Sequence, residues 1–154
     1  MQSNCGLSDP IVDQVIDQLD GIFCDLNILF YMTLNFHWNM EDPRFIALHK
    51  FLDGQYHEMV ELIDGVAERY RKLGCIVPAS MKELANGAKL REPSGQPSGD
   101  EMLTILAEAH EHMIKKVRAA VQVTADLGDP GTADMLTAQL RWHEKQDWML
   151  RSHL

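Results

Sequence analysis

The chain has 154 residues, which is enough for one domain of ordinary size, and we expect that domain to span residues 1–154. Its formal net charge is −9, and no apolar run approaches the ~20 residues that a membrane-spanning helix needs. A chain of this charge repels phosphate, so it should bind nucleic acid poorly on its own and should attract cations.

Residues 1–8 are expected to form a short N-terminal tail that carries no lysine. The first ten residues have neither the basic start nor the apolar centre of a secretion signal, so we expect a cytoplasmic protein. The cysteines are odd in number and their spacing matches no zinc motif, so we expect reduced thiols. They are Cys5, Cys24 and Cys75.

The first predicted helix opens at Asp9-Pro10 and runs to about Trp38. Asp9 is a suitable N-cap, and proline is favoured at the first helical position. Apolar residues recur along this segment at the i, i+3, i+4, i+7 spacing of a buried helix face. From Leu26 onward they spread over several faces, so we expect another subunit to cover this half of the helix.

The sequence predicts three further long helices, each opened by an N-cap or capping-box signal and the first two closed by a glycine. A long connection joins the second and third helices, and residues 79–84 within it are expected to form a short helix. This order predicts an all-α, ferritin-like four-helix bundle with a short extra helix between helices two and three. The expected starts are Asp42-Pro43, Ser98 and either Asp129-Pro130 or Thr132, and the expected ends are Gly74, Gly128 and the chain terminus.

Candidate metal ligands line one face of the second predicted helix. His49 and Asp53 are four residues apart, as are Asp64 and Glu68, so the members of each pair share a face. Asp64 follows Asp53 by eleven residues, which is about 20° beyond three full turns, so all four side chains share that face. Imidazole and carboxylate ligands suit Fe(II), Zn(II) or Mn(II). The alternative interpretation is a solvated polar face.

The two pairs cannot hold the same metal within one helix, because eleven residues span about 16 Å. A two-fold axis near Glu58 and Met59 would lay two copies of the helix antiparallel and bring each pair against the other pair of its mate. Such an isologous dimer would carry two identical sites, to which His37 could add a ligand.

A di-iron centre inside the bundle of one subunit is disfavoured. That type of centre uses a Glu-x-x-His motif, and no glutamate precedes any histidine by three residues. The residues at those positions are Leu34, Ile46, Gly54, Ala107, Ala109, Leu140 and Leu150.

Several motifs together resemble the Dps proteins, or mini-ferritins, over nearly all of residues 9–152. The spacing of the five candidate ligands, from His37 through Glu68, is highly specific to that family. The matching stretches are His37-Trp-Asn, Leu48-His-Lys-Phe-Leu-Asp53, Asp64-Gly-Val-Ala-Glu-Arg69, Leu73-Gly74, Gly131-Thr-Ala-Asp134 and His143-Glu-Lys-Gln-Asp-Trp-Met-Leu-Arg151.

The resemblance implies an iron-storing ferroxidase that protects against oxidative damage. Dps subunits form a hollow shell of twelve, with di-iron ferroxidase centres between two-fold-related subunits. Hydrogen peroxide is the usual oxidant, with oxygen as the other, and metals such as Zn(II) are expected to be able to replace iron. The implied ligands are His37, His49 and Asp53 from one subunit and Asp64 and Glu68 from its mate, with Glu68 bridging two irons or holding the tighter one.

The family also suggests roles outside the metal ligands. Trp38 is a candidate electron donor beside the metals, and the alternative is an ordinary core aromatic. Asp134 matches the carboxylates that line the three-fold iron pores of the family, and Asp126 and Asp129 are weaker candidates. The alternative for these acids is charge complementarity at a helix N-terminus.

Two other features of the sequence, a pair of histidines and the composition of the chain ends, do not predict additional binding sites. His110 and His112 are two residues apart and therefore point to different helix faces, so we expect surface histidines and no metal site. Many Dps proteins bind DNA through a lysine-rich arm, but residues 1–8 hold no lysine and only Arg151 follows Met149. We therefore expect no direct coating of DNA.

Overall fold

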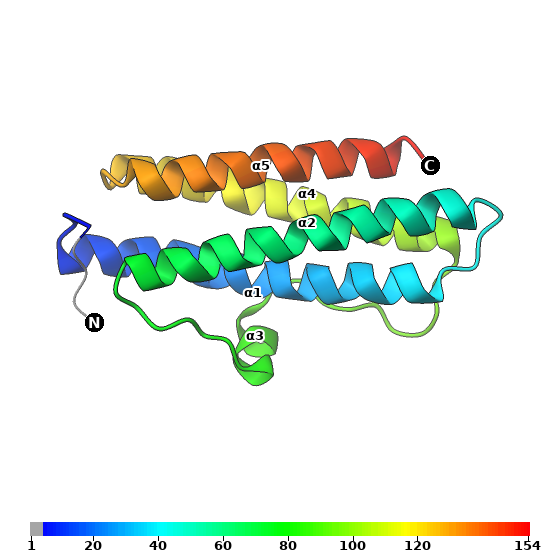
Figure 1. The fold of residues 1–154 in the computed structure, drawn as a ribbon, viewed down its shortest axis with the longest axis horizontal. Coiled ribbons are helices and arrows are strands. Elements are labelled where there is room, and N and C mark those ends of the chain that lie inside the picture. The colour runs from blue at the N-terminus through cyan, green and yellow to red at the C-terminus, as the bar shows by residue number, and fades with distance from the viewer. Residues whose placement is uncertain (1–4) are drawn as a thin grey trace.

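The structure is a computed structural model that describes residues 5–154, so the first half of the predicted N-terminal tail lies outside the described residues. That part of the chain contains five α-helices and no strand. Figure 1 shows four long helices side by side in a bundle, with the short helix standing outside it. The predicted all-α, ferritin-like architecture is confirmed. The helices are α1 (Asp9–Asn39), α2 (Phe45–Lys72), α3 (Met81–Gly87), α4 (Gly99–Asp126) and α5 (Pro130–Arg151).

The bundle is built from two helical hairpins. α1 packs on α2, α4 packs on α5, and contacts between α1 and α4 join the two pairs (Figure 1). The connection from α2 to α4 runs back along the length of the bundle and lays α3 against α1. None of the helices in the described part of the chain is both long and apolar enough to span a membrane.

The helix ends follow the predicted signals with two corrections. The N-cap position of α1 is Ser8, whose side chain makes no capping hydrogen bond, and Asp9 already lies in the first turn. α2 begins at Phe45 rather than at Asp42-Pro43. The reason is a turn in which the carboxylate of Asp42 accepts hydrogen bonds from the backbone N–H and the guanidinium of Arg44.

The glycine ends and the starts of the last two long helices are confirmed, whereas the short helix predicted over residues 79–84 spans Met81–Gly87 and α5 ends at Arg151, before the chain terminus. Gly74 and Gly128 follow the ends of α2 and α4 with φ of 87° and 78°, a left-handed conformation that glycine adopts without strain. Complete capping boxes open α3 at Ser80 and α4 at Ser98. Asp129 caps α5, which settles the choice between the two predicted starts.

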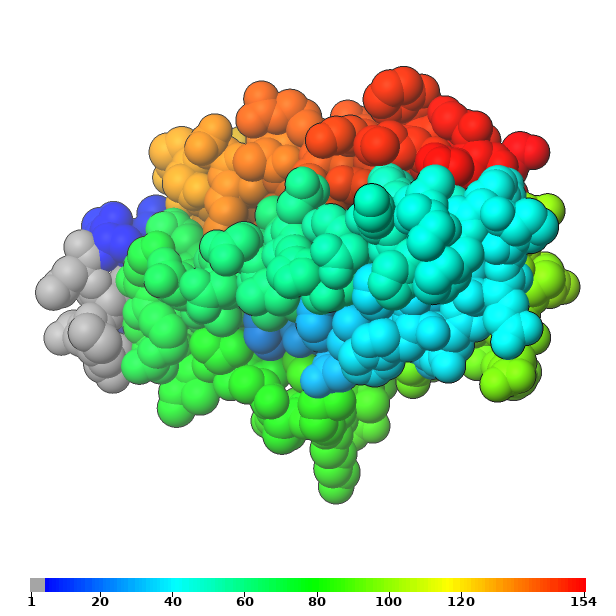
Figure 2. Space-filling view, turned by 45° about the vertical axis from the view of Figure 1, so that its right-hand side comes forward, coloured from blue at the N-terminus to red at the C-terminus, as the bar shows by residue number. Residues whose placement is uncertain are grey.

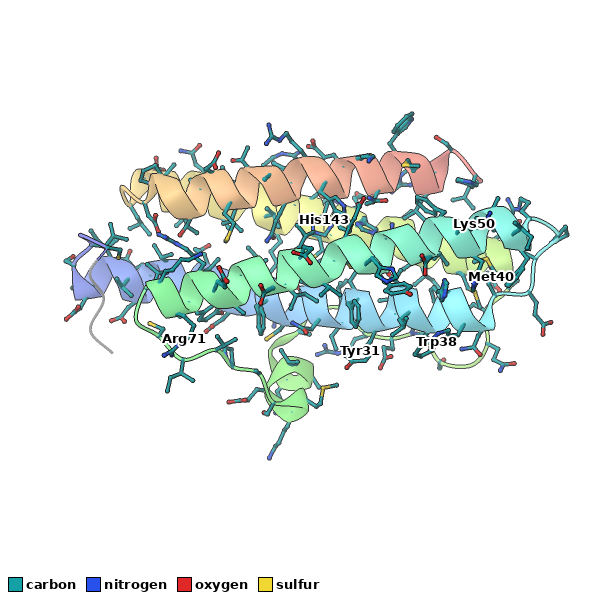
Figure 3. All side chains as sticks on the ribbon, viewed as in Figure 1. Tyr31, Trp38, Met40, Lys50, Arg71 and His143 are labelled. Carbon is teal, nitrogen blue, oxygen red and sulfur yellow. The ribbon has the colours of Figure 1, made fainter. Side chains whose placement is uncertain are left out.

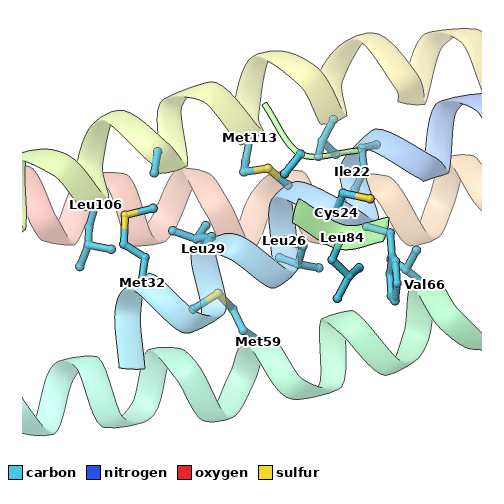
Figure 4. Packing of buried hydrophobic residues seen from close by; sticks show 14 of the residues in the cluster. Ile22, Cys24, Leu26, Leu29, Met32, Met59, Val66, Leu84, Leu106 and Met113 are labelled. Carbon is cyan, nitrogen blue, oxygen red and sulfur yellow. The ribbon is translucent and has the colours of Figure 1, made fainter. Parts of the chain in front are cut away.

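The core is a continuous cluster of apolar side chains from all five helices. Figure 4 shows Leu26, Leu29 and Met32 of α1 facing Met59 of α2 and Leu106 of α4. The inner face of α5 is more polar, because it also buries four side chains capable of hydrogen bonding. These are Thr132, Gln139, His143 and Gln146.

A buried carboxylate fastens the long connection to the bundle. Asp25 of α1 is fully buried, and its Oδ1 accepts hydrogen bonds from the backbone N–H groups of Lys89 and Leu90, at 2.5 and 2.8 Å. Its Oδ2 accepts from Lys116 at 2.6 Å and contacts the Nε2 of His112 at 2.8 Å. Asp25 therefore ties together α1, α4 and the segment that follows α3.

Candidate metal centre

His37 and His49 are held together at the end of the bundle where α1 turns into α2. The two imidazole rings stack with centroids 3.8 Å apart. The Nδ1 of His37 lies 3.0 Å from the carbonyl oxygen of His49, and the Nδ1 of His49 lies 2.9 Å from the carbonyl oxygen of His37. Because a carbonyl can only accept, each Nδ1 carries the proton. The Nε2 of each ring therefore keeps the lone pair with which imidazole binds a metal.

Asp53 lies one turn further along α2, and its side chain is 46% exposed. Its Oδ1 accepts a 2.8 Å hydrogen bond from the hydroxyl of Tyr56. This hydrogen bond raises the pKa of Tyr56, so the phenol stays protonated and donating. The second oxygen, Oδ2, lies 3.7 Å from the Nδ1 of His57 and makes no hydrogen bond in the described part of the chain.

Asp64 and Glu68 lie on the exposed surface of the other half of α2. Glu68 accepts a 2.8 Å hydrogen bond from Lys72, and this bond lowers the pKa of its carboxyl group. In Figure 2 the surface of α2 occupies the middle of the molecule's face, between α5 and α3. Both carboxylates are therefore accessible to a cation or to a second subunit.

One chain does not complete a centre. Within residues 5–154, no three histidine, cysteine or acidic side chains come close enough to hold a metal ion. The structure brings His37 and His49 together with Asp53 nearby, while Asp64 lies eleven residues beyond Asp53, about 16 Å along the axis. Any centre that uses all five residues therefore needs a second copy of the chain.

Trp38 is not a core residue, so that alternative is wrong. Its side chain is 67% exposed, and Figure 3 shows it on the outer edge of α1, near Tyr31. Both side chains line a groove of about 610 Å³ between α1 and α3, together with Met81 and Leu84. Its role as an electron donor stays a prediction.

The three candidate pore acids differ in their surroundings. Asp129 is buried, where it caps α5 through Thr132 and pairs with Arg69 at 2.7 Å. This carboxylate is occupied by structural contacts and does not fit a pore lining. Asp126 and Asp134 are exposed on either side of the turn between α4 and α5, so they stay candidates.

The surface assignment of the histidines on α4 is wrong for His110. His110 is fully buried, and its Nδ1 lies 2.9 Å from the Nδ1 of the equally buried His143 on α5 (labelled in Figure 3). Burial lowers the pKa of both imidazoles, that of His143 to about 3. Their Nε2 atoms have no hydrogen-bond partner in the described part of the chain.

The sequence held a signal for this pair. His110 occupies an apolar position of α4, four residues after Leu106 and three before Met113, both of which are buried. His112 points elsewhere, toward Asp25, which confirms that the two histidines on α4 face different directions.

Comparison of the sequence and the fold with those of known proteins identifies the family of the chain. Residues 16–154 match the ferritin-like domain family. The chain is 30% identical over 141 residues to DNA protection during starvation protein 2 of Bacillus anthracis, covering 92% of this chain and 97% of that protein. Its fold matches that of DpsC from Streptomyces coelicolor with a TM-score of 0.95 and 32% identity, covering 99% and 90% of the two chains. The chain belongs to the Dps family.

Further relatives of this Dps protein are similar to it in sequence and in fold. An uncharacterized low temperature-induced protein of Nostoc sp. is 37% identical over 153 residues, covering 98% of this chain and 86% of that protein. Dps from Thermosynechococcus elongatus has a TM-score of 0.90 at 26% identity, covering 94% and 92% of the chains. A Dps protein from Vibrio cholerae, described as a member of a broad superfamily of ferritin-like diiron-carboxylate proteins, shares the fold at 23% identity.

Proposed function

We propose that this Dps protein is a ferroxidase that oxidises Fe(II), stores the resulting Fe(III) as a mineral, and so limits oxidative damage. The observation that carries the proposal is the paired geometry of His37 and His49. Their Nδ1 atoms are both committed to backbone carbonyl groups, so their Nε2 atoms are left for a cation, and Asp53 lies one turn beyond His49 on α2. Imidazole nitrogen with carboxylate oxygen is a suitable ligand set for Fe(II).

In this proposal each centre is shared between two subunits. His37, His49 and Asp53 come from one subunit, and Asp64 and Glu68 come from its two-fold mate. The spacing on α2 supports the sharing, because the two groups of ligands lie on one helix face but too far apart along the axis to meet. Glu68 would bridge two irons or hold the tighter one.

The proposed reaction transfers electrons from two Fe(II) ions to one molecule of hydrogen peroxide. Each Fe(II) gives one electron, the O–O bond breaks, and two hydroxide ions form beside two Fe(III) ions. Because both electrons arrive together, no hydroxyl radical is released. Oxygen is the alternative oxidant, and Zn(II) would occupy the same ligands without being oxidised.

We also propose that the chain, as one ferritin-like domain over residues 1–154, assembles into a hollow shell of twelve subunits. Exposed apolar side chains on α1, α2 and α3 support extensive subunit contacts, since isolated monomers rarely expose such surfaces. Asp134 and Asp126 would then lie near pores that admit Fe(II). The apolar residues are Tyr31, Trp38, Phe45, Ile46, Val60 and Met81.

The test is Fe(II) oxidation followed by absorbance, with peroxide and oxygen compared at equal electron capacity, in a sample whose mass is measured by light scattering. We expect rapid oxidation by peroxide in a particle near twelve times 17.5 kDa. A folded monomer that oxidises iron just as rapidly would exclude the shared centre. A shell that oxidises no faster than buffer would exclude the ferroxidase.

A further inference from the structure

Tyr56 contacts two candidate ligands that come from different helices. It lies on α2, three residues after Asp53, and its hydroxyl donates to the Oδ1 of Asp53 at 2.8 Å. Its ring meets the imidazole of His37, on α1, edge-on with centroids 5.2 Å apart and an interplanar angle of 67°. One side chain therefore links the carboxylate and the imidazole of the proposed centre.

The ring of Tyr56 is itself held in place. His57 stacks on it with centroids 4.3 Å apart, and Phe30 of α1 contacts it edge-on at 6.3 Å. His57 is anchored in turn, because its Nδ1 lies 2.8 Å from the backbone carbonyl oxygen of Asp53. With aromatic contacts from both helices, the hydroxyl of Tyr56 has a defined position.

The hydrogen bond matters because Asp53 is half-exposed. An exposed aspartate exchanges rotamers readily, and ordering it on metal binding costs side-chain entropy. A hydrogen bond to Oδ1 favours one orientation, in which Oδ2 lies 3.7 Å from the Nδ1 of His57, beyond hydrogen-bond distance, and can still bind a cation. Hydrogen-bond partners of this kind orient metal ligands in many proteins, and losing one typically costs 10–100-fold in affinity or activity.

We propose that Tyr56 is a positioning residue of the ferroxidase centre. Its hydroxyl holds Asp53 with Oδ2 presented to the divalent metal, and its ring supports the imidazole of His37. This assignment rests on the proposed function, since it requires Asp53 and His37 to be ligands. Tyr56 does not touch the metal, so it is not a catalytic residue.

The test is Tyr56→Phe, which keeps the ring and removes only the hydroxyl. The probe is Co(II), titrated anaerobically into the assembled full-length protein and followed by its visible absorption, which reports both affinity and coordination geometry. We expect Co(II) affinity to fall about 10-fold or more, with an altered spectrum. With Fe(II) as substrate, KM should rise while kcat at saturation changes little. Particle mass should be unchanged.

The matched control is Tyr70→Phe. Tyr70 makes the same kind of bond, donating to Asp20 at 2.6 Å, but it is buried on the inner side of α2. It lies two residues from Glu68, which places the two side chains about 200° apart around the helix. This variant should lose stability and keep the Co(II) affinity and spectrum of the wild type.

A double-mutant cycle separates positioning from a general structural effect. In an Asp53→Asn background, adding Tyr56→Phe should change Co(II) affinity by less than a factor of two, because the oriented carboxylate is already gone. An equal loss in both backgrounds, or wild-type affinity and spectrum in Tyr56→Phe alone, would overturn the positioning role. If the wild type binds neither Co(II) nor Fe(II), the proposed function fails together with this inference.

Discussion

His37 and His49 exchange hydrogen bonds: the Nδ1–H of each ring donates to the backbone carbonyl oxygen of the other residue, at 3.0 and 2.9 Å. The exchange fixes the tautomer of both rings and joins the end of α1 to the start of α2. It therefore determines which nitrogen of each histidine is free to bind a cation.

The first prediction concerns that nitrogen. In crystals soaked with Zn(II), we expect the Nε2 of His37 and of His49 to lie about 2.0–2.1 Å from metal ions, with both Nδ1–carbonyl hydrogen bonds kept. Coordination through either Nδ1 would contradict the tautomer assignment. A metal bound by the His49 of one subunit and the Glu68 of its mate would also support the shared centre.

The second prediction concerns Asp25. Burial alone would raise the pKa of this carboxyl group, but the hydrogen bonds from Lys116, Leu90 and His112 outweigh it and lower the pKa. Asp25→Ala removes the acceptor and leaves buried donors unmatched, which should cost about 3 kcal/mol or more. The measurement is the denaturation midpoint, with Asp17→Ala on the exposed face of α1 as the control, expected to shift stability by at most about 0.5 kcal/mol.

The pH dependence of this contribution has a defined sign. Because the pKa of Asp25 is lower in the folded chain than in the unfolded chain, the stabilisation is present above the unfolded pKa and is lost as pH falls through the folded one. The wild type and Asp25→Ala should therefore converge in stability in strong acid. A constant difference down to pH 2 would contradict this account.

The third prediction concerns the buried pair His110 and His143. Both pKa values are lowered by burial, that of His143 to about 3, so the folded chain keeps both rings neutral where the unfolded chain becomes protonated. Stability should therefore fall as pH drops below the ordinary histidine value of about 6.5, by about 2 kcal/mol at pH 5 for His143, and His110 should add to the loss in the same direction.

The comparison is with a variant that carries both His110→Gln and His143→Gln. Glutamine is polar but does not titrate, so the loss of stability between pH 7 and pH 5 should be smaller in the variant. Denaturation midpoints at matched protein concentration measure the difference. If the two proteins lose stability in parallel, the pair does not titrate as its burial predicts.

The sequence predicted the fold well, because its signals are local and agree with one another. Capping boxes, terminal glycines and apolar periodicity placed every long helix within three residues of its observed start. The errors arose where a side chain makes a contact that the pattern does not reveal. Asp42 binds Arg44 in a turn, so α2 begins at Phe45 and not at Asp42-Pro43. Asp129 pairs with Arg69 and is buried, so it does not fit a pore lining.

The candidate site was predicted only in part for a similar reason. Spacing on one helix identified the face that carries His49 and Asp53. It could not reveal Tyr56, because that role depends on a hydrogen bond within α2 together with a contact to His37 on α1. His110 lies in an apolar stripe of α4, which indicates burial, but the sequence does not show that His143 on α5 lies opposite it.

The fourth prediction concerns DNA. The net charge of −9 and the absence of lysine from residues 1–8 predict no binding to duplex DNA near physiological salt without divalent metal. A gel-shift series over salt concentration, with and without Mg(II), measures this. Retarded, salt-sensitive complexes in chelator would contradict this prediction and indicate a basic surface on the assembled protein.

The last prediction tests whether each proposed ferroxidase centre is shared between two subunits. One variant carries His49→Ala and Asp53→Ala, and the other carries Asp64→Ala and Glu68→Ala. Each alone should assemble but lose rapid Fe(II) oxidation, because every centre lacks one half of its ligands. When the two are unfolded, mixed equally and reassembled, a mixed dimer has one centre without ligands and one intact centre. Random pairing makes about half of the dimers mixed, so about a quarter of wild-type activity should return.

The control is the same pair of variants refolded separately and then combined, which should stay inactive because no mixed dimers form. Mixed dimers in the co-refolded sample are verified by giving one variant a distinguishable mass and analysing cross-linked dimers. If mixed dimers are present and the sample stays as inactive as the control, His49 and Asp53 do not share a centre with the partner's Asp64 and Glu68. If each variant alone keeps rapid oxidation, the ligands lie elsewhere. Recovery of about a quarter of wild-type Fe(II) oxidation is the result expected from the spacing of Asp53 and Asp64 on α2. The two groups of ligands lie about 16 Å apart along the helix, so a single chain cannot bring them into one centre.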